Sequence, residues 1–159
     1  MSILHTRTLL VGVLATITMD VLSFTALKLR LIAFLPPRMT GRWFGLMSQG
    51  HFVHSDIAQA PTLSYEMAIA VPIHYAIGIT LALVYLAMSS TLGLNPRNLP
   101  IALGFALSTS FLPWLLMFPA MGYGWFGTHG PPGTRLFLSS LVTHCFYGLG
   151  LWMGASILS

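Results

Sequence analysis

Four stretches of this sequence are apolar over lengths that match the thickness of a lipid bilayer. A helix needs roughly 17–25 mostly apolar residues to cross the hydrocarbon core, and the stretches that qualify are residues 9–27, 67–88, 100–118 and 136–158. Because lipid offers no hydrogen-bond partner to a free backbone group, each stretch must be helical. The pattern predicts an all-α membrane protein, a four-transmembrane-helix bundle in which residues 1–159 form a single integral membrane domain.

The composition agrees with a chain that is solvated by lipid. The sequence is 55% hydrophobic and 6% charged, whereas a soluble domain is about 25% charged. The net charge of +4 comes from scattered basic residues, so no nucleic-acid-binding surface is expected and the main partner is the lipid bilayer. The single cysteine, Cys145, excludes an intramolecular disulfide. Assembly into a homo-oligomer or a larger membrane complex stays open.

The basic residues predict an orientation in the membrane. The two elaborate connections, residues 28–65 and the Gly/Pro-rich residues 119–135, are separated by two helices and therefore lie on the same side. That side carries five basic residues, and the other carries two, Arg7 and Arg97. The five are Lys28, Arg30, Arg38, Arg42 and Arg135. Because basic residues accumulate in cytoplasmic loops, we expect cytoplasmic long loops and both termini on the opposite side.

Local signals suggest where the helices begin and end. We expect the first helix to continue past Lys28 as a mixed helix until Pro36 ends it. Ser64 is a suitable N-cap for the second helix, and a short helix over residues 57–60 is expected in the long loop. Pro113 should kink the third helix, which membrane helices tolerate.

Two short patterns occur twice in the same order. A Trp-Phe-Gly triplet begins at Trp43 and again at Trp125, and a histidine lies four residues before a glycine at His74 and at His144. These matches are consistent with two tandem helix-hairpin repeats related by an axis along the membrane normal, which would place His74 opposite His144. Chance similarity in a chain rich in glycine and aromatic residues explains them equally well.

Three ionisable residues lie inside the apolar stretches. Asp20, His74 and His144 are each eight or nine residues from a charged residue at the loop-rich end, which places them roughly 12–13 Å below that side at 1.5 Å per residue. Ionisable residues inside a membrane normally face the protein interior, and small residues at four-residue spacing accompany all three. The sequence therefore predicts one intramembrane polar site formed by Asp20, His74 and His144.

This site has a structural and several functional interpretations. The three side chains could form a hydrogen-bonded cluster that only holds the helices together. Alternatively they could relay protons, bind a transition metal, or supply His74 and His144 as paired axial ligands to a haem. Which cofactor, if any, is bound does not follow from the sequence.

The elaborate loops contain a second set of candidates. His51, His54 and Asp56 are metal-compatible residue types in a short space, and His129 lies in the other elaborate loop. The simpler interpretation is that these residues bind no metal and lie in loops at the membrane interface. Arg42 is expected to anchor the chain at the lipid headgroups, or to grip an anionic substrate.

An ordered set of motifs resembles a bacterial inner-membrane family known as domain of unknown function 2938. The motifs are Met19-Asp20, Gly41-Arg42-Trp43, His54-x-x-Ile57-Ala58-x-Ala60-Pro61, His74-Tyr75-Ala76-Ile77-Gly78, Leu116-Met117-x-Pro119-x-x-Gly122 and Ser140-Leu141-x-Thr143-His144-x-x-x-Gly148-Leu149-Gly150-Leu151. The resemblance implies a multi-pass protein of the bacterial inner membrane, which would make the termini periplasmic. It implies no activity.

Three classes of function remain after these observations. The leading hypothesis is a small transporter or channel-like module for a proton, a metal ion or a small metabolite. The second is a membrane-embedded redox or transfer enzyme with a haem or metal between His74 and His144. The third is a structural membrane subunit. No catalytic signature is present in the sequence, so enzyme activity is not the favoured interpretation.

Overall fold

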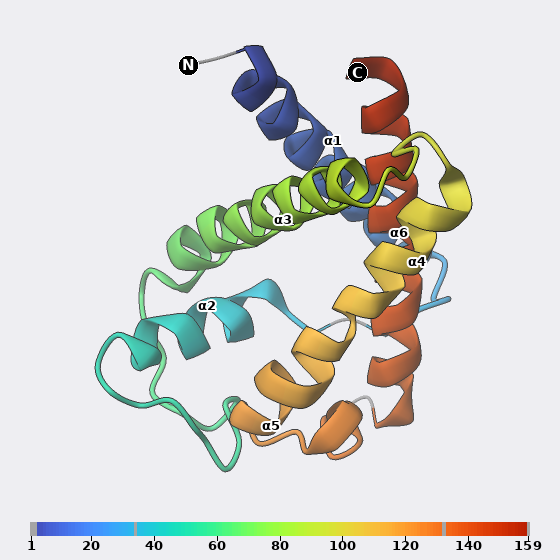
Figure 1. Cartoon of the computed structure of the whole chain (residues 1–159). Coiled ribbons are helices and arrows are strands. Elements are labelled where there is room, and N and C mark those ends of the chain that lie inside the picture. The colour runs from blue at the N-terminus through green and yellow to red at the C-terminus, as the bar shows by residue number, and fades with distance from the viewer. Residues whose placement is uncertain (1–2, 34, 132, 159) are drawn as a thin grey trace.

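The computed structural model describes residues 3–33, 35–131 and 133–158, and regular structure within these ranges is entirely helical (Figure 1). The elements are α1 (Ile3–Lys28), α2 (Pro37–Met47), α3 (Glu66–Thr91), α4 (Leu99–Thr109), a π-helical turn (Pro113–Met117), α5 (Phe118–Ala120), a 3₁₀ turn (Trp125–Gly127) and α6 (Thr134–Leu158). Four helical segments are long and apolar enough to cross a membrane: Thr6–Lys28, Glu66–Thr91, Leu99–Ala120 and Thr134–Leu158. The predicted all-α class with four such helices is confirmed.

The long helices approach one another closely at small residues. α1 packs against both α3 and α6, and α4 packs against α6. A side chain at Gly12 would place its Cβ 2.6 Å from the Cα of Ile79, and one at Gly150 would place it 2.6 Å from the Cα of Ala15. These glycines thus permit contact between helix backbones. The core around them is formed by Val11, Ala15, Ala82, Tyr85, Ala102, Ala106, Tyr147 and Leu151.

A second apolar cluster lies on the loop-rich side. Its buried members are Leu46, Ile57, Trp114, Phe118, Met121, Tyr123 and Leu136. They come from α2, from the two elaborate loops and from the ends of the third and fourth spans. α2 packs against α3 (Figure 1), so this side of the protein is a folded layer and not an open loop.

The prediction for the end of the first helix was wrong. α1 ends at Lys28, and Arg30 adopts a left-handed conformation with φ of 58°. The backbone N–H of Leu31 donates to the carbonyl oxygen of Ala26 at 2.9 Å, which closes the helix end in the manner of a Schellman motif. Pro37 then begins α2 instead of following the end of α1, because a proline in the first turn of a helix loses no intrahelical hydrogen bond.

Two other local predictions were also wrong. The N-cap of α3 is Tyr65, without a side-chain hydrogen bond, and Ser64 does not cap it. Residues 57–60 form a turn and not a helix, since the backbone N–H groups of Gln59 and Ala60 each donate to the carbonyl oxygen three residues earlier, at 3.1 and 3.3 Å. Oδ1 of Asp56 accepts from the backbone N–H of Ala58 at 2.9 Å in the same turn. At Pro113, where a kink was predicted, a π-helical turn begins.

The two halves of the proposed repeat are alike in their helix pairing but differ in the conformation of their loops. α1 packs on α3 and α4 packs on α6, as two helix hairpins would. However, Trp43 and the two residues after it lie inside α2, whereas Trp125–Gly127 form a 3₁₀ turn in which Phe126 has φ of 60°. The Trp-Phe-Gly triplets therefore do not share a backbone conformation, and the repeat stays a prediction for the helices alone.

Candidate functional site

Asp20 of α1 lies between two side chains of α3. Nε2 of His74 is 2.8 Å from Oδ1 of Asp20, and the hydroxyl of Tyr75 donates to Oδ2 of Asp20 at 3.2 Å. Since a carboxylate only accepts hydrogen bonds, the Nε2 atom of His74 carries a proton in this arrangement. The rings of His74 and Tyr75 meet edge to face with centroids 5.7 Å apart. Both oxygens of one carboxylate are thus held by neighbouring residues of a single helix.

The register of α1 against α3 produces this arrangement. One turn before Asp20, the hydroxyl of Thr16 donates to the carbonyl oxygen of Gly12 at 2.8 Å. The same hydroxyl lies over Gly78, where the Cβ of any other residue would collide with it. Gly78 is one turn after His74, so the contact between Thr16 and Gly78 sets Asp20 beside His74 in the antiparallel pair.

The pair of Asp20 and His74 is accessible although it lies within two membrane-spanning segments. The side chain of His74 is 38% exposed and that of Asp20 is 44% exposed. The apolar neighbours Val21 and Phe24 on α1 are more than half exposed. The pair is therefore at the edge of the contact between α1 and α3, open to whatever surrounds this part of the protein.

His144 makes a different interaction from the one expected. Its Nδ1 atom is 2.7 Å from the carbonyl oxygen of Ser140, one turn earlier in α6, and it donates this hydrogen bond. No group of three or more His, Cys, Asp or Glu side chains able to hold a metal ion occurs among the described residues. Asp20, His74 and His144 thus do not form one metal-binding group here. The structure joins Asp20 to His74 and leaves His144 hydrogen-bonded within its own helix.

Arg42 occupies a buried position and not a headgroup position, so the anchor prediction for it was wrong. Its Nε donates to Oε1 of Glu66 at 2.5 Å, and its side chain is only 4% exposed. One terminal nitrogen donates to the carbonyl oxygens of Ile57, Ala58 and Ala60 at 3.1–3.2 Å. The guanidinium therefore connects α2, the following turn and the start of α3, and it is not available to a substrate.

The loop candidates do not converge on one another. His51 and His129 are exposed, and Asp56 is used by the turn described above, where its Oδ2 also accepts from the amide of Gln59 at 3.0 Å. The backbone N–H of His54 donates to the carbonyl oxygen of Ala120 at 2.8 Å and so joins the two elaborate loops. The arrangement of these residues is that of a packed loop interface.

Burial also affects a tyrosine of this interface. The side chain of Tyr123 is 3% exposed. Burial raises the pKa of Tyr123, the Asp56 carboxylate raises it further, and the Arg42 guanidinium opposes both effects. The phenol therefore remains neutral at physiological pH, as an uncharged member of the loop-side cluster.

Sequence reasoning missed Tyr75 and Pro72. Adjacent residues of a helix are 100° apart, so a His-Tyr pair can place both side chains against one carboxylate on a neighbouring helix, and that was the available signal. Pro72 lies inside α3 two residues before His74. Because proline has no backbone N–H, the helix lacks one hydrogen bond there and is weakened next to the site.

Comparison with known protein families places this chain among proteins that share its sequence pattern. The sequence matches the family described as "Protein of unknown function (DUF2938)" over residues 9–158. No curated protein and no solved structure matches the chain. The match covers all four membrane-spanning segments except the first residues of α1.

Proposed function

We propose that this chain, which belongs to the DUF2938 family of proteins of unknown function, is a small membrane transport module in which Asp20 and His74 bind and release a proton. The observation that carries the proposal is the 2.8 Å contact between Nε2 of His74 and Oδ1 of Asp20, made by side chains that are more than a third exposed inside apolar helices.

The exposure of the pair favours a functional role over a purely structural one. A charged group in the middle of a membrane helix costs about 2.5–3.5 kcal/mol on insertion scales. A polar contact that only joins two helices is best placed in the buried interface, where Thr16 and Gly78 already meet. Asp20 and His74 instead lie at its edge, where a water-filled path or a transported species can reach them.

The chemistry of the pair suits reversible proton binding. In the unprotonated state the Asp20 carboxylate accepts from Nε2–H of His74 and from the hydroxyl of Tyr75. A proton that arrives at Nδ1 of His74 forms an imidazolium, whose positive charge is stabilised by the adjacent carboxylate. Loss of that proton from Nδ1 restores the first state, so the cycle consumes no other reactant.

The surroundings of the pair also suit a conformational change. Pro72 weakens α3 two residues before His74, and the third span changes from α-helical to π-helical bonding at Pro113. Helices bend most readily at such positions. Access to the pair from the two sides of the membrane could alternate by bending of α3 relative to α1.

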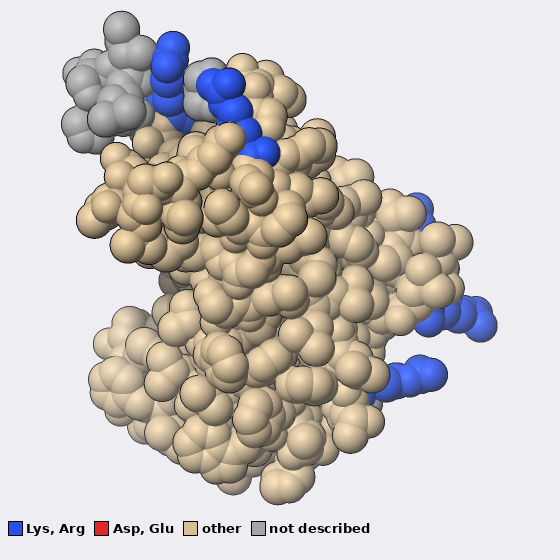
Figure 2. Space-filling model, turned by 45° about the vertical axis from the view of Figure 1, so that its right-hand side comes forward, with Lys and Arg blue, Asp and Glu red and all other residues tan. Residues whose placement is uncertain are grey.

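In this proposal the protein lies in a bacterial inner membrane with its long loops in the cytoplasm and its termini in the periplasm. Figure 2 shows basic groups at two separate edges of one face, with uncharged surface between them. The excess of basic residues on the loop-rich side supports the orientation.

Proton flux into vesicles tests the proposal directly. Purified protein is reconstituted into liposomes that contain a pH-sensitive dye, and a pH gradient is imposed together with a valinomycin-clamped potential. We expect the wild-type protein to collapse the gradient faster than empty liposomes do. Asp20→Asn should remove this flux, whereas His144→Gln, a matched change of an intramembrane histidine outside the pair, should retain it.

Two results would contradict the proposal. One is a wild-type flux equal to that of empty liposomes. The other is a flux that His144→Gln lowers as much as Asp20→Asn does. In either case a partner helix that covers the exposed pair becomes the better explanation, and the chain is then a structural subunit.

A further inference from the structure

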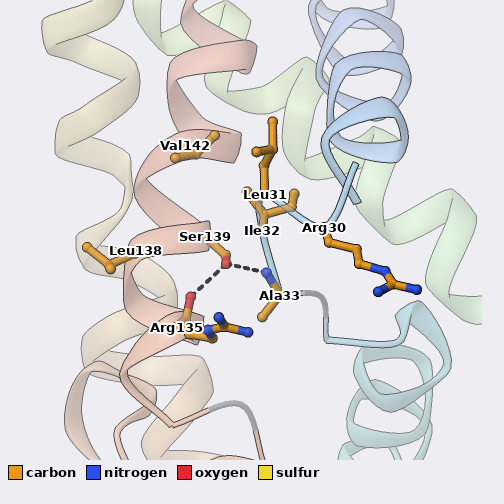
Figure 3. Close-up of a pocket in the computed structure, with 8 residues that line it drawn as sticks. All are labelled: Arg30, Leu31, Ile32, Ala33, Arg135, Leu138, Ser139 and Val142. Atoms are coloured by element: carbon orange, nitrogen blue, oxygen red, sulfur yellow. Dashed lines mark hydrogen bonds between the residues drawn. The ribbon is translucent and has the colours of Figure 1, made fainter. Parts of the chain in front are cut away.

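A pocket lies on the loop-rich side, between the segment that follows α1 and the beginning of α6. Its volume is about 150 Å³. The residues that line it are Arg30, Leu31, Ile32, Ala33, Arg135, Leu138, Ser139 and Val142 (Figure 3). Because α1 and α6 both cross the membrane and have their loop-side ends here, the pocket is at the level of the lipid headgroups.

The walls of the pocket are held in place by one serine. The hydroxyl of Ser139 donates to the carbonyl oxygen of Arg135 at 2.6 Å and accepts from the backbone N–H of Ala33 at 2.8 Å (Figure 3). Ser139 is buried, so the linker after α1 is fixed against the second turn of α6. The left-handed conformation of Arg30 turns the chain into this linker. These contacts therefore hold the walls of the pocket in a defined position in the folded protein.

The pocket has an uncompensated positive charge. The sequence contains three acidic residues, and each has its own contacts elsewhere: Asp20 with His74, Glu66 with Arg42, and Asp56 within its turn. No ion pair to Arg30 or Arg135 occurs in the described part of the chain. Two arginines among the residues that line one pocket, without a carboxylate, favour an anionic ligand.

The other walls of the pocket are apolar and continue toward the membrane interior. Leu138 and Val142 lie one turn apart on α6, with 56% and 36% of their surfaces exposed. Leu31, on the opposite wall, is 73% exposed. A free phosphate ion would make no use of these surfaces, whereas an amphiphile would contact the arginines with its headgroup and the leucines and valine with its hydrocarbon chain.

We propose that this pocket binds an anionic phospholipid, with its phosphate between Arg30 and Arg135 and one acyl chain along Leu138 and Val142. Both arginine side chains are exposed, so their guanidinium groups can turn toward one phosphate. The site is separate from Asp20 and His74, and it does not depend on the proposed transport of protons.

Native mass spectrometry of the purified protein in a neutral detergent measures this binding. Phosphatidylglycerol is the probe, phosphatidylcholine is the zwitterionic control, and inorganic phosphate is the competitor that has no acyl chain. Arg30→Gly removes one charge and suits the left-handed backbone, while Arg135→Gln removes the other. Arg38→Gln removes an exposed charge from the same side of the protein but outside the pocket, and it is the matched control.

We expect the wild-type protein to retain phosphatidylglycerol in preference to phosphatidylcholine. Each pocket variant should lower the affinity about fivefold, which is the effect of roughly one kcal/mol per basic residue at an anionic surface. Arg38→Gln should leave the affinity unchanged. A loss with Arg38→Gln equal to that of the pocket variants would show general surface attraction, and displacement of the lipid by millimolar phosphate would show a free-anion site. Either result overturns the proposal, as does equal retention of the two lipids.

Discussion

Arg42 and Glu66 form a buried ion pair, with Nε of the arginine 2.5 Å from Oε1 of the glutamate, between α2 and the first turn of α3. A further hydrogen bond holds the glutamate, because Glu66 also accepts from the backbone N–H of Leu63 at 3.0 Å. The two helices are in close contact here, since a Cβ at Gly41 would collide with the carbonyl oxygen of Glu66. The pair is thus the main polar connection between the loop-side layer and the second span.

Glu66→Gln should destabilise the protein strongly. The substitution leaves the charge of Arg42 buried without its counter-ion, which in buried pairs costs about 3–5 kcal/mol. The free energy of unfolding, followed by circular dichroism during titration with a denaturing detergent, measures this loss. Arg38→Gln is the control, because Arg38 is exposed and lies on α2, the helix that carries Arg42. Equal stability of Glu66→Gln and the wild type would mean that the pair contributes no stability.

Gly78→Ala should separate α1 from α3 at the candidate site. The added Cβ would collide with the hydroxyl of Thr16, and overpacking of this kind costs about 1–3 kcal/mol. Thr16→Ala in the same chain should restore much of the stability, because it removes the colliding atom. Gly104→Ala is the matched control, since a Cβ there meets no atom within 4 Å. Detergent-induced unfolding of the four proteins measures the effect, and a lack of rescue by Thr16→Ala would contradict the contact.

The three side chains of the candidate site should differ in their importance. Asp20→Asn removes the negative charge beside His74 and replaces one of the two carboxylate oxygens that accept from His74 and Tyr75 by an NH2 group, so it should reduce proton flux most. His74→Gln should follow. Tyr75→Phe removes one hydrogen bond of about 0.5–1.5 kcal/mol and should lower the flux only a few-fold. Liposome flux assays at equal protein content rank the variants, and a larger loss with Tyr75→Phe than with Asp20→Asn would disprove the assigned roles.

Cysteine labelling should establish the orientation of the chain. In a Cys145→Ser background, Ser48→Cys at the end of α2 and Asn95→Cys between α3 and α4 are both exposed positions. We expect a membrane-impermeant maleimide added to intact cells, with a permeabilised outer membrane, to label Asn95→Cys and not Ser48→Cys. Labelling of Ser48→Cys alone would reverse the orientation without changing the number of spans.

The sequence was least informative where a residue's partner is distant along the chain. Arg42 was expected at the lipid headgroups because it lies in a long connection beside Trp43 and Phe44. Its actual partner is 24 residues away, and the helix that presents it, α2, was not predicted. An arginine in a loop has the same local sequence signal whether it faces water or a buried carboxylate, so only the folded loop distinguishes the two.

For the candidate site, the sequence likewise identified the residues but not their partners. The polar residues inside the spans could be identified because ionisable groups are rare and costly in an apolar helix. Their grouping could not, because equal depth in the membrane does not determine the rotation of each helix about its axis. His144 donates to Ser140 within α6, whereas His74 is turned toward α1.

By itself the sequence determined the class of the protein and the number of its spans. The reason is that the bilayer imposes one length and one hydrogen-bonding pattern on any segment that crosses it. Only the tertiary structure decided which polar groups meet. The contact of Thr16 with Gly78 sets the register of α1 on α3, and the hydroxyl of Ser139 fixes the linker that forms the arginine pocket. Such contacts join residues far apart in the chain, and their geometry depends on how all the helices pack together.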